Sequence, residues 1–522
     1  MELTTTRLSA TQRWTLVVAS LAVTLVIASM AALYTALPEI AGATGSTQKE
    51  LTWIIDGYTL ALACLVLPAG ALGDRYGRRV VLIVGLCVFA AASSVPLLVN
   101  DPTWLIGTRA LAGAGAAFVM PSTLSLLTAS FPEERRGGAI GLWAGMAGAG
   151  AILGIIGSGL LLEYWSWTSI FLGMSLAGLA LLAAAFTVPE SVDEQRPALD
   201  LWGSAAVAAA VGLVVVAAIE APTRGWLSPV VLGGFLGGAV AAGLFVWIES
   251  RVAHPLLDIK LFAERGFGSG TMVVTIQFMV SFGSFMVIVQ FLQLILGYRP
   301  LISAVVLAPM MVPMVLIAVF IPRFAERFGP RLPMSIGLAV IGISFLTLAR
   351  LDIHSTYFDL LWSLLIMSAG VGLCTSPATA AIVTGTPVEK HGVAAAVNDA
   401  AREIGAAIGI AVAGSILAAG YSHRIAPALP LVPEAARGPV GDSLAATLEI
   451  TGRIGPAGDQ LAELAKISFL HGAGQAAIAL GICALAAAAV VAFWAPGRRR
   501  EPDASAKSDA SQVDSAKAPV PN

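Results

Sequence analysis

Charged residues are scarce in this chain. Only 12% of its 522 residues are Asp, Glu, Lys or Arg, whereas an ordinary soluble domain carries about 25%. A water-soluble fold of this length needs far more polar surface than this sequence can supply. The scarcity excludes a soluble enzyme and a disordered scaffold. The net charge of −2 offers no basic face, which excludes a protein that binds nucleic acid.

Residues that bind metals or form disulfides are also few. The four cysteines all fall in apolar stretches, which argues against a disulfide framework or a zinc site. The five histidines are scattered, and the sequence contains no Gly-x-x-x-x-Gly-Lys-[Ser/Thr] phosphate loop. We therefore expect no metal site, no cofactor and no enzymatic activity.

Apolar residues are abundant and make up 57% of the chain. A helix that spans a bilayer needs about 20 mostly apolar residues, and we count fourteen such runs. The sequence therefore predicts an all-α integral membrane protein with fourteen transmembrane helices. The predicted spans are 14–37, 51–72, 80–99, 104–128, 139–162, 169–188, 201–219, 230–248, 268–296, 303–321, 332–349, 360–383, 393–419 and 469–494.

The distribution of Lys and Arg predicts the orientation of these spans, because cytoplasmic loops carry an excess of both residues. With the N-terminus inside, twenty of the thirty Lys and Arg residues lie on the inner side and eight on the outer side; two lie within spans. This bias predicts a multi-pass protein of the cell (cytoplasmic) membrane with both termini in the cytoplasm. The first run is longer than the apolar core of a signal peptide, so we expect it to remain as a helix.

Two segments outside the spans stand out. Residues 420–467 form the only long loop, which we expect outside the cell. Residues 497–522 are rich in Ala, Ser, Asp, Lys and Pro, a composition typical of a disordered tail, here expected in the cytoplasm.

Two charged residues, Asp56 and Arg109, lie within the second and fourth predicted spans. A charge at mid-membrane costs about 2.5–3.5 kcal/mol, so such residues pair, face a polar interior or carry function. Each lies five residues into its span from the outer side, which places both in the outer half of the membrane. Two interpretations are open: a protonatable carboxylate that responds to Arg109, or a structural ion pair between two helices.

Three more charges, Asp399, Arg402 and Glu403, lie together in the span 393–419. Asp399 and Glu403 are four residues apart and share a helix face. Their functional interpretation is a gate or a site that attracts cations. The alternative is a polar stretch near the start of the helix, which we favour for Glu403 and leave open for Asp399.

The segment between the second and third spans is too short for anything but a tight turn. Its glycines, including Gly70 and Gly77, permit the turn and close helix contact. Asp74 can pair with Arg78 or face the N-terminus of another helix. The full pattern, Gly70-x-Leu72-x-Asp74-Arg75-x-Gly77-Arg78-Arg79, resembles the signature loop of the major facilitator superfamily.

Further motifs narrow this resemblance. Residues 109–117 resemble the fourth-span motif of the superfamily, although Ala112 stands where Gln is common. A count of fourteen spans is typical of its drug:proton antiporter branch, which includes quaternary-ammonium and multidrug exporters. Residues 53–58, 289–298 and 396–405 are similar to the second, ninth and thirteenth spans of that branch.

The resemblance implies two six-helix bundles, each an inverted repeat, with a helix pair inserted between them. The corresponding divisions are 1–200 for the first bundle, 201–267 for the pair and its linker, and 268–496 for the second bundle. Substrate would bind near the midplane while the bundles rock, in a cavity lined by the first, fourth, ninth and twelfth spans. The candidate cavity residues are Ser29, Tyr34, Met120, Gln277, Met286, Gln290, Gln293 and Asn398.

The function implied is export of lipophilic or cationic small molecules, such as drugs and antibiotics, in exchange for protons. The expected partners are the lipid bilayer, the small-molecule substrate and protons, with no nucleic acid and no obligate protein partner. Alternatives are export of an endogenous metabolite or lipid, and a facilitator with weakened proton coupling. A membrane sensor that transports nothing is a third, weaker alternative.

Two departures from the branch pattern bear on this function. Ser29 occupies the first-span position where the branch usually carries Asp, so a coupled proton would need another carrier, with Asp56 first and Asp399 second. The fifth-span motif Gly-Pro-x-x-Gly-Gly aligns with residues 154–159, which lack the proline but keep Gly154, Gly157 and Gly159. These glycines still allow a close, leak-sealing helix contact.

Overall fold

A computed structural model describes residues 8–44, 46, 48–192, 200–252, 255, 257–387, 391–454 and 458–497. These residues form helices and turns, and no strand occurs among them. Within this part of the chain, fourteen helices are long and apolar enough to cross a membrane. The predicted helical class and the predicted number of spans are confirmed. The predicted tail, apart from residue 497, lies outside the described residues.

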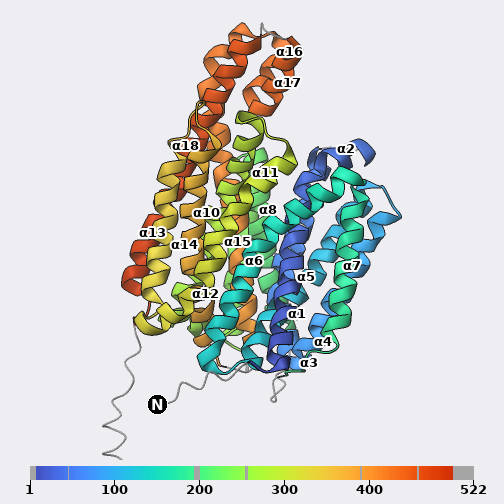
Figure 1. Ribbon diagram of the computed structural model, residues 1–522, viewed down its shortest axis with the longest axis vertical. Helices are drawn as coiled ribbons and strands as arrows, with labels where there is room; N and C mark the ends of the chain where they lie inside the picture. The colour runs from blue at the N-terminus through green and yellow to red at the C-terminus, as the bar shows by residue number, and fades with distance from the viewer. Residues whose placement is uncertain are drawn as a thin grey trace, which may run out of the picture.

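The helices lie roughly side by side in one bundle (Figure 1). We call the end where α1 begins and α18 ends the terminal face, and the opposite end the distal face. The first half contains α1 (Ala10–Ala32), α3 (Gln48–Tyr76), α4 (Arg78–Ser94), α5 (Pro102–Ser130), α6 (Glu133–Tyr164) and α7 (Thr168–Ala185). The short α2 (Leu37–Thr44) lies at the distal face.

The helix pair and the second half follow in the chain. The pair is α8 (Leu201–Arg224) and α9 (Pro229–Glu249). The second half contains α10 (Arg265–Gln290), α11 (Pro300–Leu307), α12 (Met311–Phe328), α13 (Arg331–Leu348), α14 (Tyr357–Thr384), α15 (His391–Ile425) and α18 (Asp459–Trp494). The short α16 (Glu434–Asp442) and α17 (Leu444–Ile454) precede α18.

Several helices begin where the sequence supplies a capping side chain. Ser9 and Gln12 form a capping box at the start of α1, and the Asp101 carboxylate accepts backbone N–H groups at the start of α5. Asp200 and Ser228 cap α8 and α9 in the same way. These caps explain why apolar runs that are nearly continuous in sequence separate into distinct spans.

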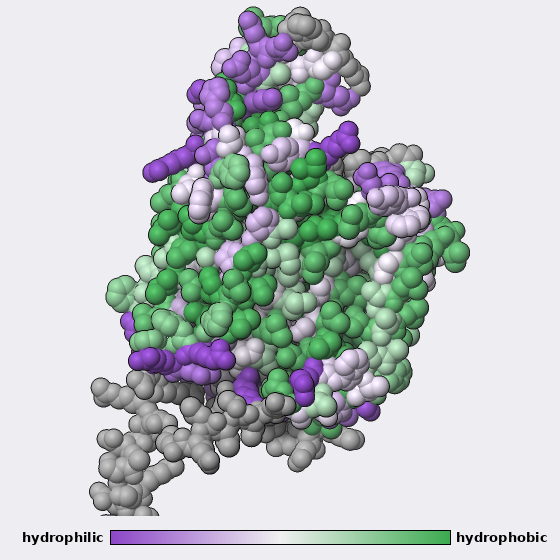
Figure 2. Space-filling view, viewed as in Figure 1, coloured by the Kyte–Doolittle hydropathy of each residue, from purple (hydrophilic) through white to green (hydrophobic). Residues whose placement is uncertain are grey.

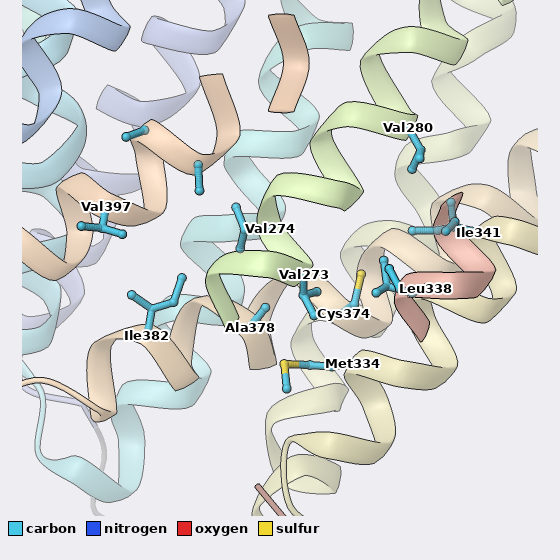
Figure 3. Close-up of a cluster of buried hydrophobic side chains, with 14 of the residues drawn as sticks. Val273, Val274, Val280, Met334, Leu338, Ile341, Cys374, Ala378, Ile382 and Val397 are labelled. Atoms are coloured by element: carbon cyan, nitrogen blue, oxygen red, sulfur yellow. The ribbon is translucent and has the colours of Figure 1, made fainter. Parts of the chain in front are cut away.

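The buried apolar residues form two main clusters, one mostly in the second half and α8 and the other mostly in the first half. In the second half, valines of α10 pack against Met334, Leu338 and Ile341 of α13 and against residues of α14 (Figure 3). On the face shown in Figure 2, exposed apolar side chains form a broad band across the middle of the molecule, and hydrophilic residues gather toward its two ends. This distribution suits a protein whose surroundings are lipid in the middle and water at both ends.

The two halves meet along two seams. The first joins α3 to α15 and the second joins α6 to α12. The helix α8 packs against both α3 and α15, so it covers the first seam, while α9 packs on α8. The inserted pair is therefore attached to both halves of the molecule.

The region expected as a long outer loop is helical in the structure. α15 continues six residues beyond its predicted span, and α18 begins ten residues before its own. Between them, residues 426–454 form a short 3-10 helix, α16 and α17, which we call the distal cap; it stands above the rest of the bundle (Figure 1). Tyr421, Val440 and Phe469 share a small apolar core there, which explains why the segment folds.

Candidate functional site

A cavity of about 360 Å³ lies in the distal half of the molecule, between the two halves. Its volume falls in the range of small-molecule binding pockets, roughly 300–1,000 Å³. The first half contributes α1 with the following turn and α3, the second half contributes α10 and α15, and α8 closes one side. The lining residues are Met30, Tyr34, Leu37, Ile55, Asp56, Thr59, Ala63, Val215, Ala218, Ile219, Met286, Glu403, Ala406, Ala407, Ile410 and Ala411.

Two carboxylates face this cavity from opposite halves. Asp56 comes from α3 and Glu403 from α15, and no Lys or Arg is among the described lining residues. The Asp56 side chain has no hydrogen-bond partner among the described residues, and Glu220 of α8 lies near enough to interact with it electrostatically. Tyr34, which is 44% exposed, interacts electrostatically with Asp56 and Glu403. An apolar cavity with two acidic groups can bind an organic cation or protons.

Arg109 does not pair with Asp56, contrary to one of the two interpretations of the sequence. Its guanidinium is buried and donates to the Ser29 hydroxyl at 3.1 Å, to the Ser29 carbonyl at 3.3 Å and to the Ile54 carbonyl at 3.2 Å. It also lies 4.2 Å from the ring centroid of Tyr58. Oxygens of α1 and α3 and an aromatic face therefore hold the cation, while Asp56 is turned to the cavity.

Asp399 and Arg402 lie about 12 Å and 17 Å along α15 from its start, and neither lines the cavity. Arg402 is 2% exposed and lies 4.8 Å from the Trp143 ring and 5.1 Å from the Phe278 ring. Its Nε and Nη2 atoms have no hydrogen-bond partner among the described residues. The Asp399 carboxylate accepts from Asn398 at 3.3 Å, and Asn398 in turn accepts from Thr379. This cluster joins α15 to α6 across the two halves.

The signature loop joins α3 to α4 and contacts the segment that follows α7. Gly77 has a φ of +111°, and a side chain there would collide with Glu190, so only glycine fits. Arg78 pairs with Asp74 at 2.9 Å and donates to the Ser191 hydroxyl at 3.0 Å. The Arg79 side chain donates to the Val188 carbonyl, and the Arg79 backbone N–H donates to the Glu190 carboxylate. Arg75 stacks over Tyr76, and Gly70 is buried within α3.

Asp74 also reaches the second half of the molecule. Its second carboxylate oxygen accepts the backbone N–H of Val393 at 3.2 Å, at the start of α15. A carboxylate at a helix N-terminus is stabilised by the helix dipole. His391, buried beside this contact, has its pKa lowered to about 4 by burial and by the nearby Arg78 and Arg136. The two halves are thus closed together at the terminal face.

The predicted cavity residues divide into two groups. Tyr34 and Met286 line the cavity, whereas the other six do not. Gln277 is satisfied within the second half, since it donates to Thr375 at 2.7 Å and accepts from Cys374. Ser29, Met120 and Asn398 are buried, and Gln290 and Gln293 are half-buried away from the lining.

The helices around the cavity also differ from the expected set. The resemblance implied the first, fourth, ninth and twelfth spans, but the lining comes from the first, second, seventh, ninth and thirteenth. With the terminal face closed, α5 and α14 are packed in the cores of their halves. The cavity therefore lies beside the seam of α3 and α15, against α8.

The three fifth-span glycines have different surroundings. A Cβ atom on Gly154 would collide with the backbone of Ala28 in α1, so α6 and α1 approach closely there. At Gly157 a Cβ would meet no atom within 4 Å. At Gly159 it would lie 2.7 Å from the side chain of Leu301 in α11, across the boundary between the halves.

Two features of this site differ from what the sequence predicts. Glu403, expected to be part of a polar helix start, lies on one helical stripe with Ala406, Ala407 and Ile410, which also line the cavity. That stripe was the available signal. The second feature, the wall formed by α8, had no signal because no charge lies within the predicted span 201–219.

Comparison with known proteins decides the family. A sequence model of the Major Facilitator Superfamily matches residues 19–410. The chain belongs to the Major Facilitator Superfamily. The expectation raised by the signature loop is confirmed, and this membership points to a transporter and not a catalytic enzyme.

Relatives within the Major Facilitator Superfamily carry resistance and export names. The multidrug efflux pump LfrA of Mycolicibacterium smegmatis is 33% identical, over 92% of this chain and 96% of its own. The multidrug resistance protein Stp of Mycobacterium tuberculosis is 31% identical, over 80% of this chain and 78% of its own. The tetracenomycin C resistance and export protein of Streptomyces glaucescens is 30% identical, over 87% of this chain and 86% of its own.

Solved structures share the superfamily fold. The human organic anion transporter MFSD10 aligns with a TM-score of 0.63 at 13% identity, over 92% of this chain and all of its own. The proton:xylose symporter XylE aligns with a TM-score of 0.60, also at 13% identity, over 94% of this chain and 96% of its own. At this identity the similarity shows the fold alone.

Proposed function

We propose that this protein exports lipophilic or cationic small molecules, including drugs and antibiotics, in exchange for protons. The observation that carries the proposal is the pair of carboxylates, Asp56 and Glu403, that face one apolar cavity from opposite halves. The export and resistance names of the relatives support the direction of transport and the class of substrate. The divisions at 1–200, 201–267 and 268–496 belong to this proposal, as do the proton-carrying candidates.

In this proposal, protons and the substrate compete for the same acidic groups. An organic cation enters from the cytoplasmic side and binds with its charge near Asp56 and Glu403. When the cavity opens to the outside, protons replace the cation and neutralise the carboxylates. Closure around neutral carboxylates then avoids burying unpaired charge, which is costly in a low-dielectric interior. Because Ser29 cannot carry the proton, Asp56 takes this role, with Glu403 as its partner; Asp399 and Arg109 act from outside the cavity.

The orientation in the proposal follows the distribution of Lys and Arg. The terminal face, with its signature-loop arginines, lies in the cytoplasm, and the distal cap lies outside the cell. The contacts of Asp74 with Arg78 and with the start of α15 would hold the cytoplasmic side shut in the state seen here. Rocking of the two halves would break these contacts and open the cavity inward.

Membrane energetics permit such exchange without ATP. One elementary charge that crosses 100 mV is worth about 2.3 kcal/mol. At about 1.4 kcal/mol per tenfold change in concentration, one coupled proton sustains a roughly 40-fold gradient of a neutral substrate. A monocation exchanged for one proton moves no net charge, so the pH gradient alone drives it, by about tenfold per pH unit.

The test is transport by the purified protein in liposomes with an imposed pH gradient and a fluorescent lipophilic monocation as reporter. We expect movement that depends on the gradient and disappears with a protonophore. Asp56→Asn and Glu403→Gln should each lower gradient-driven transport by about tenfold or more. Glu326→Gln, at an exposed position on α12 near the terminal face, is the matched control and should transport normally.

Two outcomes would change the proposal. Normal gradient-driven transport by Asp56→Asn would remove Asp56 as proton carrier. Movement by the wild type that ignores the gradient would support the second candidate, a facilitator without coupling, which the observed Ser29–Arg109 contact favours because no carboxylate accompanies that arginine.

A further inference from the structure

We infer that α8, the first helix of the inserted pair, forms a wall of the substrate cavity and sets the size of the cation that fits. The inference rests on the proposed function and adds specificity-determining residues to it. Val215, Ala218 and Ile219 of α8 line the same cavity as Asp56 and Glu403. The inserted pair is then part of the binding site and not a spacer between two bundles.

The burial pattern of α8 shows that one face is turned to the rest of the protein. Val207, Val211, Val215 and Ala218 are buried, and they recur every three or four residues. Ala209, on another face of the same helix, is exposed. In α9 only 17% of the apolar window is buried, so that helix faces outward. The two helices of the pair therefore have different surroundings, and α8 alone reaches the cavity.

Contacts at two levels hold α8 on the seam between the halves. Near its middle, a Cβ atom on Gly212 would lie 2.8 Å from the Cys64 sulfur of α3, so the two helices approach closely. Beyond its end, the Trp226 indole donates to the Ser415 hydroxyl of α15 at 2.7 Å and stacks on Phe235 of α9. α8 is thus fixed against one helix from each half, with the cavity beneath it.

The chemistry of the cavity sets the orientation of a bound cation. The acidic groups lie on α3 and α15, while α8 contributes a valine, an alanine and an isoleucine. Glu220, at the distal end of α8, is ion-paired with Arg224 and does not line the cavity. A lipophilic cation would place its charge near the carboxylates and its apolar body against α8. Side-chain volume at Ala218 and Ile219 would then decide how large that body can be.

The test compares two monocations of different size in proteoliposomes. The bulky probe is tetraphenylphosphonium and the small probe is N-methyl-4-phenylpyridinium. Ala218→Phe should lower kcat/KM for the bulky probe by about tenfold and for the small probe by less than about twofold. Ile219→Ala, which enlarges the cavity, should shift the ratio of the two values toward the bulky probe.

Ala209→Phe is the matched control, because it adds the same volume on an exposed face of α8. It should leave the ratio at the wild-type value. A ratio that is the same in all four proteins overturns the inference, and Ile219→Ala decides it alone if Ala218→Phe does not fold. Failure of the proposed function looks different, since the wild type would then show no movement of either probe that depends on the imposed pH gradient.

Discussion

Ser29 and Arg109 form a buried contact that does without the usual acidic partner. The arginine donates to both the hydroxyl and the carbonyl of Ser29, so its charge is spread over neutral oxygens and the Tyr58 ring. This arrangement fixes α1 against α5 through a single side chain. It leaves the acidic groups of the cavity free of a competing cation.

Loss of the Ser29 hydroxyl should therefore destabilise the protein. Ser29→Ala leaves the Nη1 atom of Arg109 without that acceptor, and an unsatisfied buried donor costs about 1–3 kcal/mol. Ser20→Ala is a suitable control, because the Ser20 hydroxyl is buried on the same helix and has no hydrogen-bond partner among the described residues. Thermal unfolding in detergent should show a lower Tm for Ser29→Ala only. Equal losses in the two variants would contradict this account.

At this scale the sequence predicted which residues matter better than it predicted their partners. All five charges expected within spans are largely removed from solvent, because mid-membrane charge is rare enough to be noticed in a sequence. Their partners depend on helix rotation, and a rotation of one residue turns a side chain by about 100°. Depth alone therefore left open whether Asp56 pairs with Arg109, and the structure turns Asp56 to the cavity and Arg109 to Ser29.

Among the elements, α6 approaches α1 closely at Gly154, one of the three glycines in its motif. Gly154→Ala should destabilise the protein by about 1–3 kcal/mol, because the added methyl meets the Ala28 backbone, which cannot move aside easily. Gly157→Ala adds the same methyl three residues on, where no atom lies within 4 Å. The measurement is the Tm of each purified variant. A Gly157→Ala loss as large as that of Gly154→Ala would contradict this account, because alanine is the better helix former and meets no atom there.

The start of α15 should make stability depend on pH. The pKa of His391 is lowered to about 4, below the value of about 6.5 for an unfolded histidine. The unfolded chain therefore binds more protons between these values, and stability present above pH 6.5 is lost as the pH falls toward 4. Between pH 7 and 4.5 the wild type should lose about 2 kcal/mol more than His391→Gln, which cannot titrate. Parallel unfolding curves for the two proteins across this range would refute the assignment.

At the scale of the whole molecule, a disulfide between α6 and α12 at the closed terminal face tests whether the two halves must move apart there. A Cβ atom on Gly137 of α6 would lie 3.4 Å from Cβ of Pro322 in α12, close to the separation of about 3.8 Å found in disulfides. We expect Gly137→Cys with Pro322→Cys to cross-link under mild oxidation and to stop transport until a reductant is added. Gly138→Cys with Pro322→Cys is the control, because Gly138 has no neighbour within 4 Å. Full transport by the cross-linked pair would mean that this face does not open.

The sequence predicted more of the fold than of the cavity. Apolar runs of about 20 residues have few alternatives to membrane spans, and fourteen were found in sequence and in structure. The distal cap was missed because its helices are short and amphipathic and depend on a tertiary core around Tyr421 and Phe469. The cavity was displaced from its expected helices because its position depends on the state of the two halves, which no local pattern encodes.

α15 runs without a break from the Asp74 contact, past Glu403 at the cavity, to Tyr421 in the distal cap. Its 35 residues make a rod of about 52 Å. Such a rod acts as a lever: a tilt that parts the terminal face must swing the cap at its other end. A molecule that binds the distal cap would therefore hinder the movement of the two halves without entering the cavity. A pair of fluorophores attached across the cap would report that movement.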